Sequence, residues 1–176
     1  MNQSIRILPS AEIDSTFAKE LRDWFEEEFG RADRWAEPDY YAILSIQKQV
    51  AGRLAVFDRK VSVGGVILRV GGIGGVATKP EFRHRGVASA MLARAAEFMK
   101  DSLEVEFGFL LCRHEVSPVY AKMGWTTVAG PADHIHARRS YHNVSERHDD
   151  SAACRKDMAV WSDRYARFAL VTESPI

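Results

Sequence analysis

The feature that most constrains the fold lies between residues 70 and 91, where a glycine-rich apolar segment leads through a basic turn into a helix. Residues 70–78 read VGGIGGVAT, which is typical of a strand interrupted by glycines, and Pro80 ends this strand. The turn at 83–88 reads RHRGVA. Beyond it, apolar residues recur at helical spacing: Val87, Met91, Leu92, Ala95, Phe98 and Met99. The sequence therefore predicts a strand, a basic loop and a helix in direct succession.

The connection between this strand and this helix is suited to binding an anion. The first N–H groups of a helix have no partner within it, and the helix dipole adds partial positive charge there. Gly86 lets backbone amides approach a diphosphate, and Arg83 and Arg85 add charge-assisted hydrogen bonds. The chain contains neither G-x-x-x-x-G-K-[ST] nor G-x-G-x-x-G, which excludes P-loop and Rossmann nucleotide sites. We expect a nucleotide-like diphosphate in another kind of loop.

Two motifs in this order resemble a known family. The loop fits Arg/Gln-x-x-Gly-x-Gly/Ala at Arg83, Gly86 and Ala88. A second apolar strand, FGFLLC at 107–112, precedes the ending VYAKMGW at 119–125. A strand, loop and helix followed by Tyr-x-x-x-Gly-aromatic is similar to the GNAT (Gcn5-related) N-acetyltransferases. In that family the loop holds the pyrophosphate of coenzyme A, so the resemblance implies acetyl-CoA as the cofactor.

The resemblance also implies a set of coenzyme-binding residues and a fold. The coenzyme contacts are expected from the strand end, the loop and the first helical turn, at Val76, Ala77, Thr78, Arg83, His84, Arg85, Gly86, Val87, Ala88 and Ser89. The implied fold is a GNAT-like α/β (α+β) domain. Its mixed, mostly antiparallel twisted sheet carries helices on both faces and a splayed parallel pair of strands at its centre.

The pattern of elements along the chain fits such a sheet. Strands are predicted over 4–8, 41–46, 50–61, 67–78, 105–112 and 125–128, and helices over 86–100 and 117–123. An earlier helix is capped by Asp14 or Ser15 and ends at Gly30. A final strand and helix are predicted between Met158 and Val171. Residues 31–40 and 130–155 show no periodicity and are predicted as loops.

Composition bounds the class of protein. At 176 residues, 46% of them hydrophobic, one domain over 1–176 is expected. The net charge of zero gives no long-range attraction to nucleic acid or to an anionic membrane. No apolar run reaches membrane-spanning length, and the first residues lack signal-peptide features. Cys112 and Cys154 are too few for a disulfide framework. We expect a cytoplasmic protein whose partner is a small-molecule amine, and the sequence leaves a homodimer open.

Acyl transfer from a thioester to an amine needs a base for the amine, a donor for the developing oxyanion and an acid for the leaving thiolate. The glycines at 71–72 and 74–75 bear on the oxyanion, because glycines within a strand mark a bulge or a close ligand approach. In GNAT enzymes a bulge here frees backbone amides, and by that resemblance the N–H of Val76 is the oxyanion donor. The alternative is a twisted sheet whose glycines only relieve crowding.

Tyr120 is the candidate general acid. A phenol with a pKa of about 10 is protonated at neutral pH and can protonate a departing thiolate. The resemblance implies this role, because the family tyrosine at this position lies beside the coenzyme sulfur. The alternative is a core tyrosine whose hydroxyl bonds to nearby backbone.

The general base is the least determined part of the site. A closer resemblance, over residues 41–88 and 119–131, is to aminoglycoside 2′-N-acetyltransferases and more loosely to nodulation-factor acyltransferases, which implies an aminoglycoside-like acceptor. The glutamate that activates the amine in the aminoglycoside enzymes falls on Gly74. We favour Glu115 as its replacement because the end of its strand should face the thioester, although Glu115 could instead cap the next helix. The other candidates are His114, the run 26–28, Asp133 and His134.

Three functions are weighed. The first is an N-acetyltransferase that moves acetyl from acetyl-CoA to a small-molecule primary amine by direct attack in a ternary complex. The second is a coenzyme A-binding regulator without turnover, which Gly74 favours and Tyr120 opposes. The third is a nucleic-acid module built on residues 83–85, which zero net charge and the lack of interleaved aromatic residues oppose.

Two further features are interpreted as structural. Histidines 134, 136, 142 and 148 match no known metal spacing, so no metal site is expected. Cys112 is a small buried hydrophobe unless a ping-pong mechanism uses it as an acyl acceptor.

Overall fold

The computed structural model describes residues 3–30, 37–63, 66–127, 156–162 and 169–172. Its strands are β1 (Gln3–Pro9), β2 (Tyr40–Ile46), β3 (Gln49–Val63), β4 (Val66–Thr78), β5 (Phe107–Arg113), β6 (Thr126–Thr127), β7 (Lys156–Ser162) and β8 (Ala169–Thr172). Its α-helices are α1 (Ser15–Phe29), α2 (Val87–Asp101) and α3 (Ser117–Ala121), and single 3-10 turns occur at Ser10–Glu12, Pro80–Phe82 and His114–Val116.

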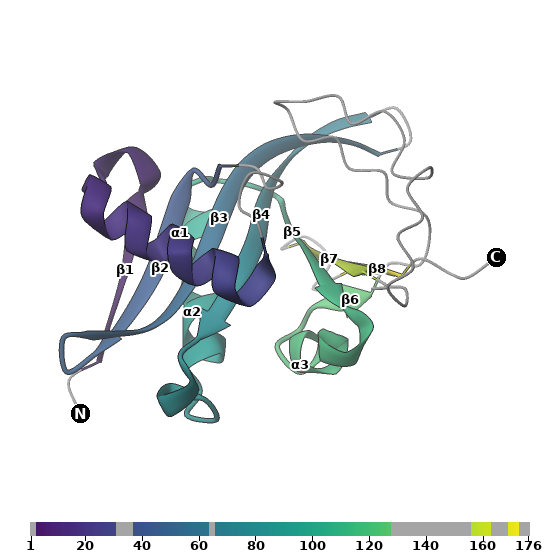
Figure 1. The fold of residues 1–176 in the computed structure, drawn as a ribbon. Coiled ribbons are helices and arrows are strands. Elements are labelled where there is room, and N and C mark those ends of the chain that lie inside the picture. Colours follow the sequence, from purple (N-terminus) through teal and green to yellow (C-terminus); the bar gives the residue numbers. More distant parts are fainter. Residues whose placement is uncertain (1–2, 31–36, 64–65, 128–155, 163–168, 173–176) are drawn as a thin grey trace.

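These strands form one mixed sheet in the order β1-β2-β3-β4-β5-β7-β6, with β8 also paired to β7 (Figure 1). Within it, β4 and β5 run parallel and the other pairs are antiparallel. The hairpin between β2 and β3 turns at Gln47 and Lys48, which both have positive φ, as a tight two-residue hairpin turn requires. The expected mixed, mostly antiparallel sheet is thus confirmed.

Helices α1 and α2 cover opposite faces of the sheet (Figure 1). A Cβ on Gly71 would meet Met99 of α2, whereas one on Gly75 would meet Phe25 of α1. Between α2 and the sheet lies the main core cluster, which includes Leu54 and Met91. Burial of this apolar surface fixes α2, and therefore its N-terminus, against β3 and β4.

The parallel pair at the centre of the sheet is splayed. Strands β4 and β5 pair only from Val70↔Phe107 to Ile73↔Leu110. Beyond Ile73, β4 continues to Thr78 without a β5 partner in the register, and the two strands diverge (Figure 1). The splayed pair implied by the family resemblance is therefore confirmed.

Two elements differ from the sequence expectation. Residues 169–172 form strand β8 rather than the end of a final helix, because this apolar segment pairs with β7 from Val160↔Ala169 to Asp157↔Thr172. Helix α3 ends at Ala121 instead of 123, because the chain turns there and the N–H groups of Met123 and Trp125 both bond to the carbonyl of Tyr120. Residues 31–36 of the loop predicted at 31–40 lie outside the described residues, as does the whole of the loop predicted at 130–155.

Candidate functional site

The connection from β4 to α2 leaves the N-terminus of α2 open. Gly86 is the N-cap of α2, so no side chain bonds to the first-turn amides. Those N–H groups, which belong to Val87, Ala88 and Ser89, have no acceptor within the helix. The loop residues Arg83 to Gly86 are exposed in front of them. This end of the helix therefore presents backbone donors and partial positive charge to an incoming anion.

Gly86 is required by conformation and not by crowding. Its φ of 76° lies in the left-handed region, and nothing lies within 4 Å of where a Cβ would stand. His84 also takes a positive φ, of 60°, so two of the three residues from His84 to Gly86 have a left-handed backbone conformation. The space beside Gly86 is large enough for a ligand that contacts the backbone.

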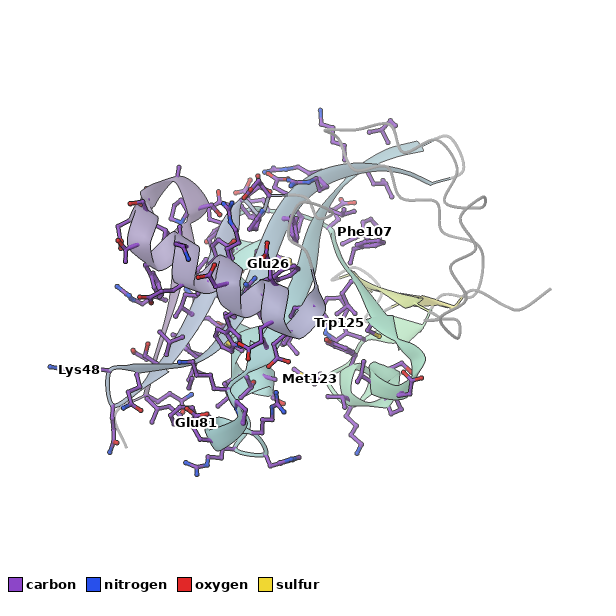
Figure 2. The ribbon with its side chains drawn as sticks, viewed as in Figure 1. Glu26, Lys48, Glu81, Phe107, Met123 and Trp125 are labelled. Carbon is purple, nitrogen blue, oxygen red and sulfur yellow. The ribbon has the colours of Figure 1, made fainter. Side chains whose placement is uncertain are left out.

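The two loop arginines have different neighbours. Arg83 donates from Nη2 to Glu28 Oε1 at 3.1 Å and from Nε to the carbonyl of Thr78 at 3.1 Å, which ties the loop to the end of α1. The guanidinium of Arg85 lies over the ring of Phe82 at 5.8 Å. Figure 2 shows Glu81 on the short turn that leads into this loop.

A bulge interrupts β4 three residues before the end of the strand. Arg53 of β3 pairs with Ala77 and Ala55 pairs with Gly74, so Leu54 alone faces the two residues Gly75 and Val76. Gly75 has a φ of 55°, which a glycine adopts without strain. The bulge that the glycines predicted is confirmed. Val76, the predicted oxyanion donor, is its second residue and lies where β4 has separated from β5; its role stays a prediction.

Tyr120 lies on α3, just beyond the end of β5. Its ring packs edge-on against Trp125 at 6.5 Å, and both Tyr120 and Val76 pack against the main core cluster. Trp125, with Met123 nearby, is labelled in Figure 2. Burial, with a smaller contribution from Cys112, raises the pKa of Tyr120 to about 12. The phenol therefore stays protonated over the physiological range, as a general acid must.

The candidates for a general base are spread over separate elements. Glu115 is exposed on the 3-10 turn that follows β5, at the same end of that strand as Tyr120. Glu28 pairs with Arg83, and Glu26 lies on α1 (Figure 2). Gly74 provides no carboxylate, and a Cβ there would stand 3.1 Å from the ring of Phe57. Asp133 and His134 lie outside the described residues.

One charged residue at the site was not singled out in the sequence. Arg53 is only 2% exposed and packs between β3 and α1, beside the bulge. A signal for it was present, because Arg53 is the one charged residue in the otherwise apolar strand segment VAGRLAVF at 50–57. Its apolar neighbours on both sides made a buried position possible, although arginine is seldom buried without a partner.

The remaining observations concern metals and membranes. In the part of the chain that the structure describes, no cluster of three or more His, Cys, Asp or Glu side chains is arranged to hold a metal ion. The four histidines at 134–148 lie outside that part. No helix among the described residues is both long and apolar enough to cross a membrane.

Comparisons with known proteins agree with this geometry. The family model for the acetyltransferase (GNAT) domain matches residues 10–128. Eis1 of Mycobacterium abscessus superposes with a TM-score of 0.58 at 16% identity, over 72% of this chain and 32% of that one. An acyl-CoA N-acyltransferase from Pseudomonas aeruginosa gives 0.57 at 15% identity, over 73% and 92%. ElaA of Escherichia coli gives 0.59 at 11% identity, over 76% and 94%. The chain spans about a third of the length of Eis1, and at these identities the likeness shows the fold.

Proposed function

Because the chain belongs to the GNAT acetyltransferase family, we propose that it transfers acetyl from acetyl-CoA to the primary amine of a small molecule by direct attack in a ternary complex. One observation carries this proposal: the uncapped N-terminus of α2 lies directly after a bulged strand that has separated from its parallel neighbour. The first feature suits a diphosphate and the second frees backbone for a thioester carbonyl.

Each proposed role has a residue that suits it. The amides of residues 87–89, with Arg83 and Arg85, would hold the diphosphate of the coenzyme, and Val76 to Thr78 would line its pantetheine. When bound, the coenzyme supplies an acetyl thioester. The N–H of Val76 would donate to the thioester oxygen as negative charge develops there, and Tyr120 would hand its proton to the leaving sulfur.

Removal of the amine proton is assigned to Glu115. Its place at the end of β5, near Tyr120 in the chain, supports this assignment. Aminoglycoside-like amines are one acceptor class to test, since the resemblance over 41–88 and 119–131 points to them.

A coenzyme A-binding regulator without turnover is the second candidate, which Gly74 favours because it provides no base. Purified protein is incubated with acetyl-CoA and a panel of amines, and thiol release is measured beside calorimetric binding of acetyl-CoA. Release with at least one amine, lost in Tyr120→Phe, supports the enzyme. Tight binding without release, unchanged in Tyr120→Phe, supports the regulator. Absence of binding removes both.

A further inference from the structure

Arg53 is a cation enclosed by apolar groups. Its guanidinium lies 5.0 Å from the ring centre of Phe25 and 5.2 Å from that of Tyr41. Nη1 donates to the carbonyl of Leu21 at 2.7 Å, which ties the guanidinium to α1. Burial lowers the pKa of Arg53 to about 10, and the group still carries its charge at neutral pH.

Among the described residues, the Nε atom on the other side of this guanidinium has no partner. The buried Nε of Arg53 makes no hydrogen bond, and within the described ranges no carboxylate forms an ion pair with Arg53. A buried donor without an acceptor destabilises the fold, and more so when it is charged. Such groups are rare in folded proteins and call for an explanation.

A second arginine of the same sheet, Arg69, shows which kind of group the Nε–Nη2 edge of an arginine can bind. Arg69 donates from Nε at 2.8 Å and from Nη2 at 2.6 Å to the two carboxylate oxygens of Asp58. This fork is the geometry that matches a carboxylate. In Arg53, Nη1 is bonded to Leu21 and Nε has no partner, so a fork of this kind would use the Nε–Nη2 edge.

That edge lies at the bulge. A Cβ on Gly75 would stand 3.1 Å from Nη2 of Arg53 and 3.0 Å from the ring of Phe25. Gly75 precedes Val76, the proposed oxyanion donor. The free side of Arg53 is therefore one residue from the place where an acceptor amine would meet the thioester, on the face of β4 that α1 covers.

We propose that the Nε–Nη2 edge of Arg53 binds a carboxylate carried by the acceptor, so that the acceptor is an amino-carboxylate and not a polycationic amine. This inference rests on the proposed function, which supplies the acceptor amine. A carboxylate on this edge compensates the buried charge. A polycation at the same place is repelled by that charge.

The experiment compares amines that differ only in charge. Glycine, β-alanine and 4-aminobutanoate are each paired with the corresponding carboxamide, and one aminoglycoside is added. Thiol release from acetyl-CoA is measured for the wild type, Arg53→Met and Arg53→Lys. Arg59→Met is the matched control. Arg59 also lies over an aromatic ring, that of Phe57, but it is paired with Asp39.

The wild type should favour at least one carboxylate over its amide by tenfold or more in kcat/KM. Arg53→Met should abolish that preference, and Arg59→Met should retain it. An equal preference in the wild type and Arg53→Met, or a wild type that favours the amide or the aminoglycoside, would overturn the inference. If Arg53→Met does not fold, the inference is tested by the preference of the wild type and of Arg53→Lys for a carboxylate over its carboxamide.

Calorimetry separates this inference from the proposed function. The three amino acids and their three carboxamides are titrated into each protein in the presence of coenzyme A. Carboxylate binding that Arg53→Met loses, without thiol release from any amine, supports the Arg53 site and removes the proposed function. Release with amines and no carboxylate preference in either measurement removes the Arg53 site alone.

Discussion

The coenzyme end of β4 and the face of β4 under α1 are built in different ways. The first comes from one continuous stretch, residues 76–89, and offers mainly backbone amides to its ligand. The second brings together Leu21 and Phe25 of α1, Tyr41 of β2 and Arg53 of β3, and it offers side chains. A shared cofactor needs only the backbone geometry. A specific acceptor needs side chains that can change without disturbing that geometry.

The two regions also differ in their charges. Arg83 and Arg85 are exposed, so water and salt screen them and their effect on a ligand is local. Arg53 is buried, so its charge is screened far less and any group beside it experiences a stronger field. Substitutions in the first region should therefore change coenzyme affinity, and those in the second should change which acceptor is used.

The largest effect is expected at Tyr120, the proposed general acid. Tyr120→Phe removes the proton donor and keeps the ring that packs against Trp125. We expect kcat to fall by about 10²–10⁴-fold with little change in the KM for acetyl-CoA. Steady-state kinetics with the best amine measure both constants. If both stay at wild-type values, Tyr120 only packs the core.

The raised pKa of Tyr120 predicts a stability effect with a defined sign. The phenol titrates near 10 when unfolded and near 12 when folded, so the folded state keeps its proton longer. Its contribution to the free energy of unfolding is complete below pH 10 and is lost as the pH rises to 12. Chemical denaturation at pH 9 and pH 11.5 should show a larger decline in the wild type than in Tyr120→Phe. An equal decline would contradict the burial of this phenol.

Glu115 is expected to give the next largest effect, and it tests whether the base lies on the α3 side of the site. Glu115→Gln should lower kcat/KM for the amine by about 10²-fold or more. Glu12→Gln is the control, because Glu12 is also an exposed carboxylate on a 3-10 turn. If Glu115→Gln behaves like the control, the amine arrives neutral or another group takes its proton.

Gly86 tests the coenzyme region alone. Gly86→Phe places a side chain in the diphosphate space and should raise the KM for acetyl-CoA by about 10- to 100-fold, through lost charge-assisted hydrogen bonds. Gly30→Phe is the matched control, since Gly30 also has a positive φ, of 82°, and nothing within 4 Å of its Cβ position. Gly86→Phe should lose about 1–2 kcal/mol of stability. Gly30→Phe should lose at least as much, because the ψ of Gly30, −171°, lies in a region that is essentially restricted to glycine. A KM that rises equally in both would assign the effect to strain.

The same contrast explains what the sequence predicted. The loop and the bulge depend on neighbouring residues, whose glycines and spacing restrict the backbone directly. The site around Arg53 depends on contacts across 32 positions, such as that with Leu21, which no local pattern contains. The helix predicted at the end of 158–171 was wrong for a related reason, because the short segment ALVT becomes a strand only when β7 lies beside it.

The smallest effect concerns the link between the two regions, the pair of Glu28 on α1 with Arg83 in the loop. This pair is partly exposed, so Glu28→Gln should cost less than about 1 kcal/mol of stability. It should also release Arg83 toward the diphosphate and lower the KM for acetyl-CoA about twofold to fivefold at low salt, with less change at high salt. Asp23→Asn, which breaks the exposed pair of Lys19 with Asp23 on the same helix, should leave the KM unchanged. A higher KM in Glu28→Gln would mean that the pair holds the loop in its binding form, so that α1 supports the coenzyme region as well as covering the acceptor face.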